Sequence, residues 1–233
     1  MLSRTSFLKL GVALAGAAVS SRTAERASVR RWDVITIGNL SRNRYWREPD
    51  EKPLRDAICT CTLITGDGFR LLVDPSIADR TAMLRELDRR TGLKPDAVTG
   101  VFITHEHGDH VAGIEHFANA PWWAATPVAE ALNRTKRYSR KFEPAPAVLF
   151  EAVEVIATPG HTATHHSLQF ACEGQSVVVA GDAVATRDFW RERRSYYNAV
   201  DPVLAARTMD LLAATAAVIV PGHDNYFVTG RGT

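Results

Sequence analysis

Six consecutive residues form the densest cluster of chemically active side chains in this sequence. Residues 105–110 read His-Glu-His-Gly-Asp-His and directly follow the apolar run 101–104. His105 and His107 are two positions apart, so in an extended segment both side chains point to the same side. The glycine permits a sharp turn, after which the aspartate and the last histidine can face the same point. Three imidazoles and a carboxylate suit zinc, iron or manganese better than calcium, so we predict a metal site here rather than a histidine-rich surface loop.

Three further potential ligands follow short runs in the second half of the chain. The runs 153–158, 177–180 and 217–220 are rich in β-branched residues, as is typical of buried strands, and each leads into a glycine turn. In open α/β sheets, functional groups gather at the carboxyl ends of the strands. We therefore expect four strand ends to bring seven side chains together. The predicted metal ligands are His105, His107, Asp109, His110, His161, Asp182 and His223.

The remaining elements are those needed to build a sheet around these strand ends. Residues 66–68 read Gly-Asp-Gly between two apolar runs, which is a clear hairpin signal. Glycine at position 92 closes an amphipathic segment and so predicts the end of a helix. Predicted strands cover residues 32–37, 57–65, 69–74, 98–104 and 122–125, and predicted helices cover residues 81–90, 111–117 and 127–132.

The N-terminal segment has the order of a targeting signal. Basic residues Arg4 and Lys9 precede the apolar run 10–19, small residues follow, and the first acidic residue is Glu25. This order is typical of a secretory signal, although an organellar transit peptide is the alternative and a cytoplasmic location stays open. We therefore exclude residues 1–28 and expect export to the periplasm or the outside. Residues 29–233 are predicted to form one domain in which no other segment is a candidate membrane span.

The charge and the cysteine content argue against a general nucleic-acid-binding protein and against a disulfide-rich or zinc-finger protein. The net charge is +2, but residues 1–31 contain six Lys or Arg against one Glu, so the rest of the chain has a net charge of −3. This mild acidity does not favour general attraction to nucleic acid. The three cysteines, Cys59, Cys61 and Cys172, form neither a CxxC pair nor an evident disulfide framework, so they are interpreted as small core residues.

The motifs, in this order, resemble those of the metallo-β-lactamase-fold hydrolases. The resemblance rests on residues 105–110, on Thr-Pro-Gly-His-Thr at 158–162, on Ala-Gly-Asp at 180–182 and on Pro-Gly-His at 221–223, and it covers about residues 32–227. It implies an α/β fold of the αββα sandwich type with two metal ions between the sheets, zinc by expectation and manganese or iron as alternatives. The implied first ligand set is His105, His107 and His161, the second is Asp109, His110 and His223, and Asp182 would bridge the two.

Two cations about 3.5–4 Å apart can share a water molecule, lower its pKa and polarise the scissile bond. Asp109 is then a catalytic candidate that takes up or orients the proton of the attacking water. Asp74, Thr104 and Thr162 are expected to orient ligands through hydrogen bonds, with turn capping as the alternative role of Asp74.

The resemblance predicts a hydrolase but leaves several activities open. Asp182 stands where one major class of true β-lactamases has a cysteine, so antibiotic hydrolysis is not favoured. Because the folded part is acidic, we favour a small-molecule ester, lactone or thioester as substrate. The alternative is a phosphodiesterase or ribonuclease, since the short members of the family include small animal proteins to which RNA cleavage has been ascribed. An iron-dependent oxygenase and a non-catalytic metal-binding protein are the remaining hypotheses.

Two segments are candidates for substrate contacts. Residues 187–197 follow Asp182 closely, so we predict contacts from Trp190, Arg194 and Tyr196, with an inward-packed aromatic helix as the alternative. Residues 134–141 are rich in Arg and Lys and are interpreted as a solvated connection, with an anion-binding patch as the alternative. The sequence makes no prediction of the oligomeric state.

Overall fold

The structure is a computed structural model that describes residues 28–230. Its first half forms a six-stranded sheet with the strand order β1-β2-β3-β4-β5-β6. These strands are β1 (Val29–Thr36), β2 (Cys61–Gly66), β3 (Phe69–Val73), β4 (Gly100–Ile103), β5 (Trp122–Ala124) and β6 (Glu143–Pro144). The predicted hairpin is present, since Gly66 pairs with Phe69 across a two-residue turn in which Gly68 has a φ of 78°.

The second half forms another six-stranded sheet with the order β12-β11-β10-β9-β8-β7. These strands are β7 (Val148–Leu149), β8 (Val153–Ala157), β9 (His166–Cys172), β10 (Gln175–Gly181), β11 (Val218–Pro221) and β12 (Phe227–Val228). The chain crosses once from the first sheet to the second, between β6 and β7.

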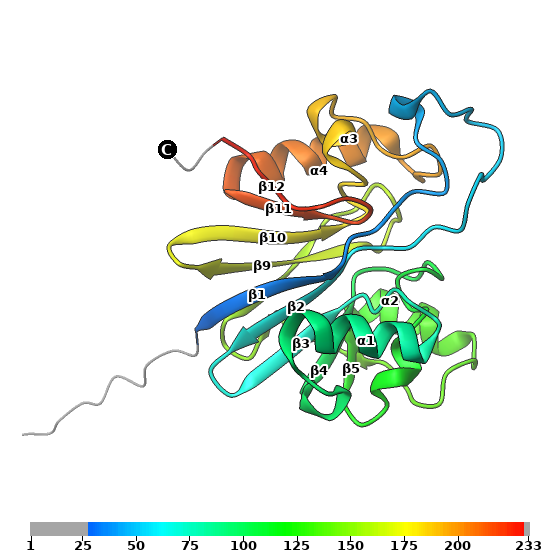
Figure 1. The fold of residues 1–233 in the computed structure, drawn as a ribbon. Helices are drawn as coiled ribbons and strands as arrows, with labels where there is room; N and C mark the ends of the chain where they lie inside the picture. Colours follow the sequence, from blue (N-terminus) through cyan, green and yellow to red (C-terminus); the bar gives the residue numbers. More distant parts are fainter. Residues whose placement is uncertain (1–27, 231–233) are drawn as a thin grey trace, which may run out of the picture.

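Helices cover the outer faces of the two sheets, which gives the αββα sandwich (Figure 1). The helices are α1 (Arg80–Thr91), α2 (Thr126–Arg134), α3 (Arg187–Arg191) and α4 (Pro202–Thr215), with short 3-10 helices at Arg44–Trp46, Pro95–Ala97 and Ile114–Phe117. Helices α1 and α2 lie on the first sheet, and α3 and α4 lie on the second (Figure 1). The fold class predicted from the sequence is confirmed.

Alternation along the strands explains the three apolar layers. In β4, Val101 and Ile103 belong to the cluster under α1 and α2, whereas Phe102 points between the sheets. In β10, Val177 and Val179 point between the sheets, whereas Val178 packs toward α4. Strands buried on both faces read as continuous runs of apolar residues, which is why these segments were recognisable in the sequence.

Strand directions gather the chemically active turns at one edge of the sandwich. Strands β3 and β4 are parallel, as are β10 and β11, and β8 runs in the same direction as β10 because both are antiparallel to β9. Two backbone hydrogen bonds join this edge across the sheets: His166 N–H donates to the Thr104 carbonyl at 3.0 Å, and Thr60 N–H donates to the Gly222 carbonyl at 2.6 Å. The residues that follow these five strands therefore meet.

Some element boundaries differ from the sequence-based predictions. The helix predicted at 111–117 is only a 3-10 helix at Ile114–Phe117, because the backbone of Gly113 turns away to donate to the Pro75 carbonyl at 2.8 Å. The helix considered at 187–197 stops at Arg191. The basic run 134–141 connects α2 to β6, and its Arg140 donates to the carbonyls of Ala118 and Ala120.

The predicted targeting segment lies outside the described residues, except for Ser28 at its end. Its export function therefore stays a prediction. Within residues 28–230, none of the helices has the length and apolar character that crossing a bilayer requires.

Candidate metal centre

The first group of predicted ligands comes from the turns after β4, β8 and β10. His105, His107, His161 and Asp182 each place a ligand atom within 4.8 Å of the others. His161 Nε2 lies 3.0 Å from His107 Nδ1 and 3.2 Å from Asp182 Oδ2. His105 Nε2 lies 3.9 Å from the same carboxylate oxygen. The group therefore converges on one small volume.

The second group comes from the β4 turn and the turn after β11. Asp109, His110 and His223 also place ligand atoms within 4.8 Å of one another. His223 Nε2 lies 3.5 Å from Asp109 Oδ2 and 3.1 Å from Asp182 Oδ1, and His110 Nε2 lies 3.3 Å from Asp182 Oδ1. Asp182 thus presents one oxygen to each group.

The donor set fits two metal ions. Atoms bound about 2.0–2.1 Å from a tetrahedral zinc ion lie about 3.3 Å apart, close to the spacings within each group. His105 Nε2, His110 Nε2 and Asp182 Oδ1 are buried and make no hydrogen bond to any described residue. Buried polar atoms without a partner are costly, so their convergence is the arrangement expected of a cation-binding site. Imidazole nitrogens with two carboxylates suit zinc, iron or manganese.

Hydrogen bonds behind the ligands fix which ring nitrogen faces the centre. Asp74 Oδ2 accepts from His110 Nδ1 at 2.8 Å and from Thr104 Oγ1 at 2.8 Å. Thr104 Oγ1 in turn lies 3.1 Å from His105 Nδ1 and can accept its proton. In the neutral form of each ring, these partners hold the proton on Nδ1 and leave Nε2 free to face the centre, which is the arrangement that metal-ligating histidines require.

The third oriented histidine is His223. Its Nδ1 lies 3.0 Å from the Asn39 carbonyl and 3.1 Å from the Ile58 carbonyl, so its proton is held by the backbone of the loop between β1 and β2. The sequence carries no signal for these partners, because any residue type supplies a carbonyl.

Thr162 differs from its predicted role. Its hydroxyl is buried and forms no hydrogen bond with the described residues. Thr162 instead contributes its backbone carbonyl, which accepts from Gly160 N–H at 3.0 Å and closes the turn that carries His161. The predicted hydrogen bond from this side chain to a ligand is therefore absent, whereas those of Asp74 and Thr104 are present.

Burial and neighbouring charges together set the protonation of the ligands. Burial lowers the pKa of His161 to about 4 and lowers that of His105 well below its ordinary value, so both rings are neutral near pH 7. Burial opposes ionisation of Asp182, but the nearby imidazoles of His223 and His110 hold the pKa of this carboxyl well below its usual range. Burial also opposes protonation of His110 and His223, but nearby acidic groups, Asp182 among them, outweigh it and raise the pKa of both imidazoles above the ordinary value. A bound cation would therefore replace a proton on these two rings, whereas His105 and His161 are already in the neutral form that binds a cation.

Replacing Asp74 by Asn is expected to weaken metal binding by about 10- to 100-fold, the usual cost of losing a ligand's hydrogen-bond partner. Asp74 has a φ of 52°, which Asn tolerates well, so the backbone is preserved. The new amide, however, has one acceptor oxygen for the three donors that the carboxylate now serves. Metal affinity measured by competition with a chromophoric chelator checks this. The exposed hairpin variant Asp67→Asn should bind like the wild type, and equal affinity of all three proteins would contradict the assigned role of Asp74.

Replacing Gly222 by Ala is expected to displace Asp182. An added Cβ would lie 2.0 Å from Asp182 Oδ1, the oxygen that faces His110 and His223. The variant should therefore purify with less metal than the wild type. Gly108→Ala is the matched contrast, since a Cβ there meets nothing within 4 Å. Elemental analysis of both proteins tests the difference, and wild-type metal content in Gly222→Ala would show that this contact does not matter.

Comparison with known proteins agrees with this geometry. The family model described as the metallo-β-lactamase superfamily (Lactamase_B) matches residues 54–223, which is most of the chain. The chain belongs to the metallo-β-lactamase superfamily. This assignment confirms the family recognised from the four motifs.

Among the similar proteins, some names give only the metallo-β-lactamase domain and others give a lactonase activity. Metallo-β-lactamase domain-containing protein 1 of Xenopus laevis is 35% identical over 173 residues, covering 70% of this chain and 69% of that protein. The Mus musculus protein of the same name is 32% identical over 162 residues, and the match spans 66% of this chain but only 58% of the mouse protein. An N-acyl homoserine lactonase of Bacillus thuringiensis is 26% identical over 150 residues, covering 58% of this chain and 60% of the lactonase.

The fold is also found in solved structures. The crystal structure of a quorum-quenching N-acyl homoserine lactone lactonase superposes with a TM-score of 0.65 at 21% identity. The match covers 86% of this chain and 99% of the lactonase.

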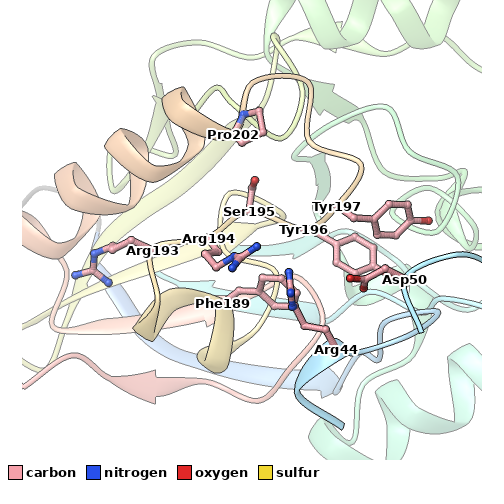
Figure 2. Close-up of a pocket in the computed structure, with 9 residues that line it drawn as sticks. All are labelled: Arg44, Asp50, Phe189, Arg193, Arg194, Ser195, Tyr196, Tyr197 and Pro202. Carbon is pink, nitrogen blue, oxygen red and sulfur yellow. The ribbon is translucent and has the colours of Figure 1, made fainter. Parts of the chain in front are cut away.

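A cavity of about 290 Å³ is lined by nine residues, none of which is one of the seven predicted metal ligands (Figure 2). It is enclosed by the loop between β1 and β2, by α3 and by the segment that follows α3. The lining residues are Arg44, Asp50, Phe189, Arg193, Arg194, Ser195, Tyr196, Tyr197 and Pro202. Two of the three predicted substrate contacts, Arg194 and Tyr196, are therefore in the wall of one cavity, and their role in binding stays a prediction.

Trp190 is not in this wall. Its ring is 7% exposed, packs 5.7 Å from the Phe227 ring and belongs to the apolar cluster that includes Met209. The alternative interpretation, an aromatic packed inward, describes its position. Trp190 points into the layer between the second sheet and its helices because it occupies the buried side of the short helix α3.

Proposed function

We propose that this chain is a hydrolase that uses two metal ions to cleave a carboxyl-ester, lactone or thioester bond. Zinc is the expected metal, with manganese or iron as alternatives. Two divalent ions, when bound, supply an activated water and polarise the scissile carbonyl. The observation that carries the proposal is the division of the Asp182 oxygens between two histidine groups. A single-ion site or a structural site would not need a carboxylate placed between two ligand sets.

The chain's own residues take distinct parts in this chemistry. His105, His107 and His161 would hold one ion, and His110, His223 and Asp109 would hold the other. Asp109 is the ligand whose carboxylate is most open, with 22% of its side chain exposed compared with 5% for Asp182. Asp109 is therefore the group best placed to accept the proton that the attacking water gives up.

The choice of a carboxyl-ester or lactone rests on two supports. The described part of the chain is mildly acidic by composition, and the Bacillus thuringiensis relative is named a lactonase. Phosphodiester cleavage is the second candidate, because three arginines line the cavity shown in Figure 2. The iron-dependent oxygenase and the non-catalytic metal-binding protein have no comparable support.

Turnover of two model substrates by the zinc- and manganese-loaded protein tests the proposal. One is a simple lactone and the other an activated phosphodiester, and Asp182→Asn is the control for trace contaminants. Lactone cleavage that is absent in the variant is the expected result. Phosphodiester cleavage alone would favour the second candidate, and no cleavage of either by protein with its full metal content would contradict a hydrolytic function.

A further inference from the structure

Arg42 is a buried cation without a hydrogen-bond partner for most of its guanidinium. The residue is 2% exposed, and its Nε and Nη1 atoms form no hydrogen bond with any described residue. Its backbone is well held, since the Arg42 carbonyl accepts from the Tyr196 hydroxyl at 3.1 Å. A buried guanidinium whose N–H groups are unsatisfied is strongly unfavourable, so it requires a reason other than packing.

Arg42 makes one contact through its guanidinium, and this contact does not satisfy the N–H donors. Its guanidinium lies 3.8 Å from the centroid of the Tyr197 ring, a cation–π contact that occupies one face of the group. The N–H donors lie in the plane of the guanidinium and are not satisfied by a ring stacked on its face. Tyr197 lines the cavity with more than half of its surface exposed, so the Arg42 guanidinium lies directly behind the cavity wall.

The cavity in front of Arg42 is itself cationic. Arg44 and Arg194 both line it near Phe189, while the third lining arginine, Arg193, points away and pairs with Asp210 at 3.0 Å (Figure 2). Asp50 is the one carboxylate among its lining residues. The balance of charge in this wall therefore favours an anion.

Backbone ties place this cavity beside both ligand groups. Asn39, whose carbonyl accepts from His223, is three residues from Arg42, and Val200, whose N–H donates to the His161 carbonyl, is three residues from Tyr197. Three residues span at most about 11 Å. The backbone of the stacked pair therefore lies within about 11 Å of residues that contact each ligand group.

We propose that Arg42, with Arg44 and Arg194, binds a carboxylate or phosphate group that the substrate carries away from its scissile bond. This inference rests on the proposed hydrolytic function. Rotation of the half-exposed Tyr197 ring opens the guanidinium to the cavity, and the planar donors of arginine match the oxygens of either anion. The substrate is then an anionic ester or lactone rather than a neutral one.

The test compares three aryl esters of equal length, which end in a carboxylate, a phosphate or a methyl group. The wild type should hydrolyse at least one anionic ester with a KM about 10- to 100-fold lower than that of the neutral ester, the range expected for charged hydrogen bonds. Arg42→Met should raise the KM of that anionic ester to the neutral value while kcat stays near that of the wild type. Whichever of the two anionic esters has the lower KM identifies the anion, carboxylate or phosphate, that the site binds.

Four further measurements separate binding from folding. Arg42→Lys should keep part of the preference, and Arg191→Met, which removes a charge from an exposed position of α3, should keep all of it. If Arg42→Met does not fold, Arg194→Met is used in its place and should reduce the preference in the same direction. Glutarate should raise the melting temperature of the wild type more than that of the Arg42 or Arg194 variant.

Equal KM values for the charged and neutral esters in the wild type would overturn the anion site but leave the hydrolase intact. If the metal-loaded wild type hydrolyses none of the three esters, the proposed function is contradicted instead. The two failures are therefore distinguishable. A preference that survives in both arginine variants would also overturn the assignment to Arg42 and Arg194.

Discussion

Asp182→Asn is expected to lower kcat/KM for any hydrolysed substrate by more than about 100-fold, because losing a group that merely orients a ligand already costs 10- to 100-fold. The carboxylate lies 3.1–3.3 Å from His110, His161 and His223 through its two oxygens. An amide of the same shape has one oxygen for two ion positions and carries no charge. Steady-state kinetics on the best model substrate, together with metal analysis of the same sample, measures the effect.

The matched control is Asp88→Asn, which removes an exposed carboxylate that pairs with Lys94 on the surface. It should retain wild-type kinetics, since exposed ion pairs contribute little. Turnover by Asp182→Asn within a few-fold of the wild type would mean that the carboxylate does not serve both ligand groups.

Removal of metal is expected to lower the melting temperature by about 8–16 °C. Binding that is specific to the folded state adds about 4 kcal/mol at a free metal concentration 1,000 times Kd, and about 1 kcal/mol corresponds to 2–4 °C in a protein of this size. The physical cause is the set of buried nitrogen and oxygen atoms at the centre that no described residue satisfies. Differential scanning calorimetry before and after dialysis against a chelator measures the shift, and added zinc should reverse it.

The Asp182→Asn variant supplies the control for this measurement too. It should show a smaller chelator-induced shift, because fewer ligands converge in the folded state. An unchanged melting temperature of the wild type after verified metal removal would show that the folded state does not depend on ions at this centre.

The metal centre could be predicted from the sequence because its signals are local. His105 and Asp182 directly follow apolar runs that are buried on both faces, and a strand of this kind has few alternatives. The parallel direction of β10 and β11 then brings the turns together without any further information. The layers of the fold, in contrast, were predicted through the resemblance to a known family and not from the strand pattern alone.

Two elements that support the centre were missed although their signals are present. Helix α4 begins at Pro202 after Asp201, whose side chain accepts from Leu204 N–H at 2.9 Å, an ordinary capping arrangement. Strand β9 alternates with Leu168 and Phe170 facing the space between the sheets. Both could have been identified from local pattern alone.

Other features depend on tertiary contacts and have no local signal. The partners of His223 are backbone carbonyls of Asn39 and Ile58, more than 160 positions away. Burial of Arg42 likewise depends on Tyr197, far along the chain, so the arginine-rich loop after β1 gave no indication that one of its arginines is enclosed.

The most direct test of the account is the number of metal ions that each chain binds in the wild type. Protein purified without chelator, supplied with zinc and desalted, should contain two ions per chain by mass spectrometric elemental analysis, because Asp182 presents one oxygen to each of two ligand groups. One ion or none per chain, in folded protein supplied with zinc, manganese and iron in turn, would contradict the two-ion centre.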